Sequence, residues 1–397
     1  MTGPRRARRR GSASLAKPLA GLRVIEMGTF ITGPAAAMHL ADLGADVVKV
    51  ERPETGDPFR AFKGALYAPH FQTYNRNKRS IALDTTKPED RAVFHDLIRD
   101  ADVFIQNFRP GVAEKLGAGS EELQGLNSRL VYCAISGFGT TGPNRDRPAF
   151  DTVAQAASGF LRLLVPPDRP RVIGPAIADS VTGFYAAFGI LGAIVERNAT
   201  GKGRRVDVSM LEAMCHFNLD AFTHYYSAGE VMGPLSRPSV SQSYVFQCAD
   251  DKWIALHMSS PPKFWENLAA AIGKPDLLKD PRFSDRMGRI AHQDELIDIM
   301  APLFRGKTRD AWVAILDEAE VPFSPAYDSA EALEDPQARH LRIRVETEHP
   351  VIGRWQTVRS PLSFDGEPNF DVTAPPLLDE HGKEIREEAA AKRRAAE

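Results

Sequence analysis

Residues 19–51, LAGLRVIEMGTFITGPAAAMHLADLGADVVKVE, predict a strand, a helix and a second strand. The first apolar run ends at Gly28, and Pro34 then stands where the first turn of a helix tolerates a residue without an N–H group. The helix is expected to end at Gly44, and residues 46–51 are expected to form a second buried strand. Strand, helix and strand in so short a stretch make a βαβ unit, which predicts a parallel sheet.

The alternation of strands and helices continues along the chain. A strand is expected over residues 80–84, a helix over 89–100, and further strands over 102–106 and 130–135. The first half of the chain is therefore expected to be a doubly wound, Rossmann-like α/β domain. In such domains ligands bind outside the carboxyl ends of the strands.

Cationic, amide and aromatic side chains gather in the loops at these strand ends. Arginine, lysine and asparagine suit phosphate groups, and phenylalanine offers a stacking surface to a nucleobase. A phosphorylated, nucleotide-like ligand is therefore expected, although a solvated surface would carry the same residue types. The sequence has neither G-x-G-x-x-G after the first strand nor G-x-x-x-x-G-K-[ST], which argues against a dinucleotide cofactor and a nucleotide-hydrolysing loop. The loops are Thr29–Pro34, Arg52, Tyr74–Arg79, Asn107–Gly111 and Ser136–Gly139.

One acidic residue, Asp179, precedes a long apolar run. The run from Phe184 to Val195 predicts a buried helix that ends near Gly201. The partial positive charge and free N–H groups of the first turn are expected to hold the carboxylate ionised and to bind an oxyanion. These properties suit a carboxylate nucleophile, although an aspartate that only caps the helix is the alternative interpretation.

The second half of the chain has a different pattern. The large domain is expected to span residues 18–225, and the Gly-, Pro- and Ser-rich residues 226–243 are expected to be a linker. Residues 244–335 begin with a predicted hairpin followed by helices, which indicates a smaller α+β domain. Residues 336–397 are expected to be a linker and a segment that returns to the large domain.

Composition limits the class of protein. The 397 residues, 43% of them hydrophobic, support more than one domain with a full core. The chain has 50 Lys and Arg and 52 Asp and Glu, which gives a net charge of -2. This balance does not favour binding to nucleic acid or to an anionic membrane. The longest apolar run, residues 181–195, is shorter than the roughly 20 residues that span a bilayer. Three scattered cysteines predict a cytoplasmic protein without a metal site.

Residues 1–17 contain five arginines and are expected to form a disordered basic tail. A mitochondrial transit peptide is the alternative interpretation, although the segment lacks the apolar face of a targeting helix.

Several stretches, all in order along the chain, resemble the class III CoA-transferase family. This family includes formyl-CoA:oxalate and carnitine CoA-transferases and the related α-methylacyl-CoA racemases. The stretches include NRNKRSIALD and SGFGTTGP, and together they cover residues 19–57, 75–84, 101–117, 136–143, 150–159, 178–210 and, more weakly, 378–385.

The resemblance implies that Asp179 is the catalytic residue. Its carboxylate would attack an acyl-CoA thioester to give a mixed anhydride, which the released thiolate would convert to an aspartyl-CoA thioester. An incoming carboxylic acid would then take the CoA. A carboxylate with a pKa near 4 is ionised but a weak nucleophile, so the mechanism needs an activated acyl group, which the thioester supplies. The helix start and glycine-containing loops would stabilise the tetrahedral oxyanions.

The resemblance further implies coenzyme A as part of the substrate, no tightly bound cofactor, and an interlocked homodimer. The basic residues would bind the phosphates of CoA, and the aromatic ring would stack on adenine. The positions that match the CoA contacts of the family are Ile31, Thr32, Arg52, Asn75, Arg76, Asn77, Lys78, Asn107, Phe108, Arg109, Lys115, Ile135, Ser136, Gly137 and Phe138.

The chain also departs from its relatives. Formyl-CoA:oxalate enzymes carry glutamine where Ile31 stands and lysine where Ser136 stands, and they have a glycine-rich loop in place of Ser239–Ser243. Specificity for oxalate is therefore not expected. The racemases have a histidine where Phe150 stands, and phenylalanine cannot exchange a proton.

Three functions remain open at this point. The first is transfer of CoA between carboxylic acids through Asp179. The second is an acyl-CoA racemase or epimerase in which Asp179 acts as a base. The third is a CoA-binding protein without catalytic activity.

Overall fold

The computed structural model describes residues 17–63, 67–259 and 261–396. The contacts between Cα atoms divide it into two compact units. Unit 1 contains the residues up to 158, residues 174–217 and the residues from 345 onward, whereas unit 2 contains residues 159–173 and 218–344.

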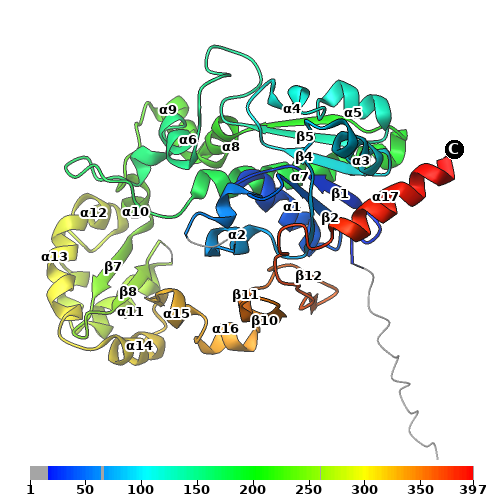
Figure 1. Ribbon diagram of the computed structural model, residues 1–397. Coiled ribbons are helices and arrows are strands. Elements are labelled where there is room, and N and C mark those ends of the chain that lie inside the picture. The colour runs from blue at the N-terminus through cyan, green and yellow to red at the C-terminus, as the bar shows by residue number, and fades with distance from the viewer. Residues whose placement is uncertain (1–16, 64–66, 260, 397) are drawn as a thin grey trace, which may run out of the picture. The chain divides into compact units, whose positions relative to one another are not determined.

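Unit 1 is built on a parallel sheet of six strands in the order β3-β2-β1-β4-β5-β6 (Figure 1). This is the strand order of a doubly wound nucleotide-binding sheet, so the predicted α/β fold is confirmed. The order reverses between β1 and β4, and a ligand crevice is expected outside the carboxyl ends of these two strands. The strands are β1 (Arg23–Glu26), β2 (Asp46–Glu51), β3 (Lys78–Ala82), β4 (Val103–Gln106), β5 (Val131–Ser136) and β6 (Arg205–Ser209).

Of the six strands in this sheet, β6 is the one that the sequence does not predict. It pairs with β5 at the edge of the sheet, and its residues alternate between exposed and half-buried side chains until the buried Ser209. An edge strand with charged residues lacks the continuous apolar run that marks the central strands.

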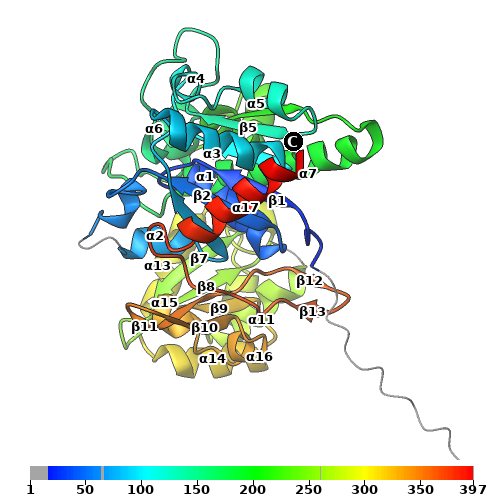
Figure 2. The same ribbon diagram turned by 45° about the vertical axis from the view of Figure 1, so that its right-hand side comes forward.

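Helices cover both faces of the sheet. On one face α1 (Thr32–Asp42) packs against α7 (Ile177–Thr200), and both contribute to a core with β1, β4 and β5. On the other face lie α3 (Pro88–Arg99), α5 (Ser120–Leu126) and the C-terminal α17 (Gly382–Ala396). Figure 2 shows α17 beside α3, where Arg393 forms an ion pair with Asp96.

The helix α7 ends as the sequence predicts. Gly201 has a left-handed backbone with φ of 76°, and its N–H donates to the carbonyl oxygen of Arg197 at 2.7 Å. By length and composition α7 could cross a membrane, but 44% of its most apolar stretch is buried within the protein. Ala186 and Ile190 are fully buried against the sheet, so α7 has the packing of a core helix.

Shorter elements complete unit 1. They are a 3-10 helix at Pro58–Arg60, α2 (Pro69–Tyr74), α4 (Val112–Lys115), α6 (Asp151–Ala157), α8 (Met210–Phe217), and the strand pairs β10 (Arg344–His349) with β11 (Gly353–Val358) and β12 (Ser363–Phe364) with β13 (Glu367–Pro368).

Unit 2 has an antiparallel sheet of three strands, β7 (Ser243–Gln247), β8 (Trp253–His257) and β9 (Phe323–Ala326). The predicted hairpin is β7 and β8. Their apolar side chains share a core with Trp265, Trp312 and the helices around them. Residues 226–243, expected to be a linker, contain the helix α10 (Ser236–Ser241). The other helices are α9 (Leu219–Ala228), α11 (Pro262–Ala271), α12 (Arg286–Ala291), α13 (Gln293–Phe304), α14 (Arg309–Glu318), α15 (Ser329–Ala332), α16 (Pro336–His340) and 3-10 turns at Phe160–Leu163 and Pro275–Leu278.

Candidate active site

Asp179 is the third residue of α7, which begins at Ile177 after the N-cap residue Ala176. The cap comes from another helix. Asp151, the first residue of α6, accepts hydrogen bonds through Oδ1 from the N–H groups of Ala178 (2.8 Å) and Asp179 (3.3 Å). The expectation that the first turn of α7 offers free N–H groups to an oxyanion is therefore wrong, because a carboxylate already takes two of them.

Asp151 is itself held in place. Its Oδ2 accepts a hydrogen bond of 2.6 Å from Nε2 of Gln155, a side chain that is only 1% exposed. Three donors thus fix this carboxylate, and it cannot move away from Asp179 without losing them.

The environment of Asp179 disfavours its charged form. Burial, and to a lesser extent the negative charge of Asp151, raises the pKa of Asp179 to about 7. This corrects the expectation that the helix holds Asp179 ionised, because the loss of water and the like charge outweigh the partial charge of the helix start. Near neutral pH the side chain therefore exchanges between carboxylic acid and carboxylate.

Tyr74, the last residue of α2, also lies at this site. Its hydroxyl hydrogen-bonds with Ser180, and burial together with the charges of Asp179 and Asp151 raises the pKa of Tyr74. Tyr74 therefore remains a neutral phenol next to the carboxyl group.

Gly183 brings the start of α7 close to the start of α1. A Cβ atom at Gly183 would lie 2.8 Å from Cβ of Ala35 and 3.0 Å from the carbonyl oxygen of Thr32, so a larger residue would push the helices apart. The helix α1 begins at Thr32 after Ile31, and no side chain among the described residues caps it. Asp179, one turn before Gly183, is thus close to a helix start whose first N–H groups are not taken by a side chain.

Asn107, at the end of β4, joins the two loops at the point where the strand order reverses. Its Oδ1 accepts from the N–H of Thr29 (2.9 Å), and its Nδ2 donates to the carbonyl oxygen of Thr29 (2.7 Å) and to Oγ1 of Thr32 (2.9 Å). Asn107 and Thr32, both predicted ligand contacts, therefore fix the start of α1.

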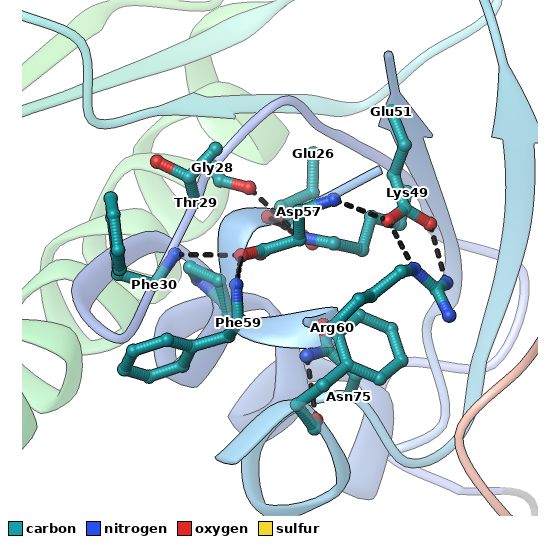
Figure 3. A network of polar contacts seen from close by, with 12 residues as sticks. Glu26, Gly28, Thr29, Phe30, Lys49, Glu51, Asp57, Phe59, Arg60 and Asn75 are labelled. Atoms are coloured by element: carbon teal, nitrogen blue, oxygen red, sulfur yellow. Dashed lines mark hydrogen bonds and ion pairs between the residues drawn. The ribbon is translucent and has the colours of Figure 1, made fainter. Parts of the chain in front are cut away.

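A network of buried charges lies beneath the loop that follows β1 (Figure 3). Nζ of Lys49 is 3.0 Å from Oε1 of Glu26 and 3.0 Å from Oδ2 of Asp57, and all three side chains are fully buried. The same Nζ donates to the carbonyl oxygen of Gly28 at 2.8 Å. The network is therefore linked directly to the loop.

Two more cations complete the network. Lys78 lies 3.1 Å from Oε2 of Glu26, and burial lowers the pKa of Lys78 to about 8 although Glu26 raises it. Arg60 donates to both oxygens of Glu51 at 2.7 Å each and lies over the ring of Phe71. Three buried carboxylates thus face three cations.

Asp57 connects this network to Phe30. Its Oδ1 accepts from the N–H groups of Phe30 (3.2 Å) and Phe59 (2.9 Å) (Figure 3). Phe30 has a left-handed backbone with φ of 61°, which costs on the order of 1–3 kcal/mol in a residue with a side chain. Its ring meets Phe59 at 5.2 Å and Phe150 at 6.1 Å, both edge to face. The network therefore fixes the loop before Ile31.

Several predicted ligand contacts are buried structural residues. Asn75 bonds to the carbonyl oxygen of Phe71, and Lys78 bonds to Asn75 and to the carbonyl oxygen of Pro34. Arg76 makes two bonds to Asp42, of 3.0 and 2.6 Å. The side chains of Asn75, Arg76 and Lys78 thus bond within the protein, and their contact with a ligand stays a prediction.

Asn77 is half-buried and also serves the fold. Its Nδ2 donates to Oδ1 of Asp42 at 2.9 Å, and its Oδ1 accepts from the N–H of Thr373 at 2.7 Å. Arg52 and Lys115, by contrast, have exposed side chains, and Ile31 is buried at the start of α1.

A cleft of about 460 Å³ opens at the ends of β4 and β5. Four predicted contacts line it, namely Phe108, Arg109, Ile135 and Ser136. Gly137 and Phe138 continue the loop; Gly137 packs against Ala149, and the guanidinium of Arg147 lies 5.5 Å from the ring centre of Phe138.

The cleft also contains two cations that the sequence analysis missed, Arg145 and Arg205. Arg205 is on β6, the strand without a sequence signal, and it bonds to Asp207 and to Ser120. Arg145 follows the SGFGTTGP stretch and could have been included with that loop. Among the described residues, no group of three or more His, Cys, Asp and Glu could hold a metal ion.

Comparison with known proteins finds one family that matches most of the chain. The family described as CoA-transferase family III matches residues 19–382. Succinyl-CoA--D-citramalate CoA-transferase of Chloroflexus aurantiacus is 34% identical over 375 residues, which cover 93% of each chain. Acetyl-CoA:oxalate CoA-transferase of Acetobacter aceti is 33% identical over 381 residues, covering 94% of this chain and 96% of that one.

The fold agrees with these matches. The crystal structure of a CaiB/BaiF family protein from Brucella suis superimposes with a TM-score of 0.84 at 31% identity, covering 94% of this chain and 100% of that chain. The similarity thus extends over both units and is not limited to a common sheet. The chain therefore belongs to CoA-transferase family III and is an enzyme of that family.

Proposed function

We propose that the protein transfers CoA from an acyl-CoA to a free carboxylic acid through covalent intermediates on Asp179. In the first step a carboxylate oxygen of Asp179 attacks the thioester carbonyl, a C–O bond forms, and the C–S bond breaks to release the CoA thiolate. The product is a mixed anhydride. The thiolate then attacks the Asp179 carbonyl, which gives an aspartyl-CoA thioester and releases the first acid as a carboxylate.

The second half of the reaction reverses these steps with another acid. The incoming carboxylate attacks the aspartyl-CoA thioester, forms a new mixed anhydride and releases the thiolate. The thiolate attacks the carbonyl of the new acyl group, which yields the new acyl-CoA and restores the Asp179 carboxylate. Each step exchanges one carboxylate for one thiolate, so the cycle needs no external proton donor or oxidant.

The family match over residues 19–382 carries the proposal of CoA transfer, and the place of Asp179 at the start of α7, where burial and Asp151 raise its pKa to about 7, supports its role as the nucleophile. A carboxylate of higher pKa is more basic, and within a series of similar nucleophiles greater basicity gives faster attack. The disadvantage is that Asp179 is ionised in only part of the enzyme molecules at neutral pH. A side chain that merely capped α7 would gain nothing from this environment, and Asp151 already fills that role.

The start of α1 supports the same chemistry. Tetrahedral intermediates at either carbonyl carry an oxyanion, which backbone N–H groups stabilise best when they are already oriented. The first turn of α1 lies against Gly183 of α7, and no side chain among the described residues caps its N–H groups. They replace the start of α7 as the proposed oxyanion donors.

We place the nucleotide end of CoA in the cleft at the ends of β4 and β5. Arg109, Arg145 and Arg205 supply positive charge for its phosphates, and Phe108 supplies an aromatic face for adenine. Arg52 and Lys115 remain candidates because their side chains are exposed. The loop Ile135–Phe138 and the start of α1 then lie on the way from this cleft to Asp179.

We also propose that the enzyme is an interlocked homodimer, as the family resemblance implies. The outer face of α7 exposes Phe184, Phe188 and Val195, which are 61%, 68% and 71% exposed. A row of large apolar side chains on one helix face is typical of an interface. Light scattering of the purified protein is expected to give the mass of two chains.

The substitution Asp179→Ala tests the mechanism. CoA exchange between acetyl-CoA and a panel of carboxylic acids should fall at least about 10³-fold, because the carboxylate that forms the anhydride is gone. Calorimetry should show that the variant still binds CoA, since the cleft is unchanged. Exchange at the rate of the unaltered enzyme in Asp179→Ala would contradict the proposal.

A further inference from the structure

Aromatic side chains surround the start of α7. A buried cluster contains Ile31, Phe59 and Phe71, and Phe30, Tyr67, Tyr74 and Ala176 pack against it. Ala176 is the N-cap residue of α7, so the cluster contacts the helix that carries Asp179. Tyr74 reaches the next turn, where it hydrogen-bonds with Ser180.

Two phenylalanines at the edge of this cluster are open to solvent. Phe150 is 61% exposed and Phe62 is 60% exposed. Phe62 contacts Phe59 at 5.1 Å and His70 at 4.9 Å between ring centres, and Phe150 contacts Phe30 at 6.1 Å. Together Phe30, Phe59, Phe62 and Phe150 form a continuous row of rings, which is called the aromatic wall below.

The aromatic wall is adjacent to Asp179. Phe150 directly precedes Asp151, whose carboxylate bonds to the N–H of Asp179. Phe30, at the other side of Phe150, directly precedes the start of α1. Phe150 and Phe30 therefore stand at the starts of α6 and α1, the two helices that pack against α7, which carries Asp179.

One member of the aromatic wall, Phe30, is held in place by the protein. The left-handed backbone of Phe30 persists because the fully buried Asp57 binds its N–H, and Lys49 binds Asp57 (Figure 3). A ring held in this way loses little conformational freedom when it contacts a substrate, so little binding free energy is lost to ordering it.

The charges near Asp179 oppose a second carboxylate. Asp151, another acid, accepts hydrogen bonds from the N–H groups of Ala178 and Asp179, so a carboxylate already lies at the start of α7. A dicarboxylic acid would bring a third negative charge to this place and would desolvate it against phenyl rings, which is costly without a counter-ion.

We propose that the aromatic wall is the acyl subsite and that the preferred acids carry one carboxyl group on an aromatic or bulky apolar body. This inference rests on the proposed function, since it needs the acyl group to be attached to Asp179. The names of the two relatives given above specify D-citramalate and oxalate, which have two carboxyl groups each. The inference therefore separates this chain from them.

A panel of acceptors tests the inference. With acetyl-CoA as donor, kcat/KM for phenylacetate and hexanoate should exceed that for oxalate, succinate and glutarate at least about tenfold, because a buried ring or several methylene groups are worth more than 1.4 kcal/mol. A preference for any of the dicarboxylic acids would overturn the inference and leave the proposed function intact. If no acid accepts CoA, the proposed function itself fails.

Substitutions in the aromatic wall test whether its rings cause the preference for apolar acids. In Phe150→Ser and in Phe62→Ser, the ratio of kcat/KM for phenylacetate to that for acetate should fall about tenfold, because the ring contact and its apolar area are lost. The control is Phe364→Ser, which changes a phenylalanine of unit 1 that is 47% exposed on β12, and it should leave the ratio unchanged.

The alternative is that a second copy of the chain packs on the exposed rings. Light scattering on the same variants tests it. If Phe150→Ser and Phe62→Ser break the oligomer while the phenylacetate to acetate ratio stays the same, the wall is an interface and the inference is overturned. A changed ratio in an intact oligomer supports it.

Discussion

Unit 1 contains two groups of neighbouring carboxylates, and the charges around the two groups are opposite in sign. Glu26, Glu51 and Asp57 are almost entirely buried, and three cations compensate them. Asp151 and Asp179 are also close to each other, but the described residues place no cation beside Asp179. The first group holds a loop in a strained shape, whereas the second has a carboxyl group of raised pKa.

The comparison shows that burial alone does not make an acid reactive. Glu51 is more deeply buried than Asp179, yet hydrogen bonds and charge from Arg60 lower the pKa of Glu51. What distinguishes Asp179 is that its nearest charged neighbour has the same sign. The three predictions below test this difference, beginning with the largest expected change in stability.

Removing a cation from the compensated group should be severe. In Lys49→Met the free energy of unfolding should fall by about 3–5 kcal/mol, because Glu26 and Asp57 would be left buried without their partner. Urea unfolding at neutral pH measures the change. The matched control is Lys383→Met, whose side chain is 90% exposed and which should change stability by less than about 0.5 kcal/mol. An equal loss of stability in the two variants would show that Lys49 does not compensate Glu26 and Asp57.

Removing the charge of Asp179 should have the opposite sign. Since the pKa of Asp179 is about 7 in the folded protein and near 4 when unfolded, its contribution to stability declines as the pH rises from about 4 to 7. Asp179→Asn should therefore be more stable than the unaltered protein by on the order of 1–4 kcal/mol at pH 8, and by much less at pH 4. Urea unfolding at both pH values measures this. A variant less stable at pH 8 would mean that Asp179 is compensated after all.

The smallest of the three effects concerns the pH dependence of catalysis. The rate kcat/KM for acyl-CoA should rise with pH around a midpoint near 7, because only the ionised Asp179 attacks. In Asp151→Asn the midpoint should move to lower pH, since the like charge is gone while the amide oxygen can still accept from α7. Initial rates across the pH range provide the measurement. A midpoint that stays in place would show that Asp151 does not act on Asp179.

Most of the fold could be predicted from the sequence, for a simple reason. The strands β1, β4 and β5 are largely apolar runs, β2 and β3 each keep a short apolar core, and the helices between the strands have clear boundaries. The strand β6 could not be predicted, because its sequence RVDVS pairs on one side only and keeps charged residues in solvent. Arg205 was missed with it.

The candidate site was predicted less completely. Asp179 could be located because it stands at the start of a predicted helix. The residue that caps this helix could not, because Asp151 is distant in sequence and starts a different helix. The basic loop predicts that Arg76 and Lys78 contact a ligand, and the sequence does not show that they also pair with Asp42 and Glu26, acids that only the folded chain brings near. Charge patterns along a sequence do not reveal which charges will be paired in the interior.

The most direct measurement for the uncompensated carboxyl group is mass spectrometry of the enzyme after it has been mixed with acetyl-CoA. At about pH 8, where Asp179 is ionised, quenching with hydroxylamine should convert the peptide that contains Asp179 to a hydroxamate, and at about pH 6 the conversion should be slower. The peptide should stay unmodified in Asp179→Asn. Turnover without modification of this peptide, or with modification of another residue, would contradict the account.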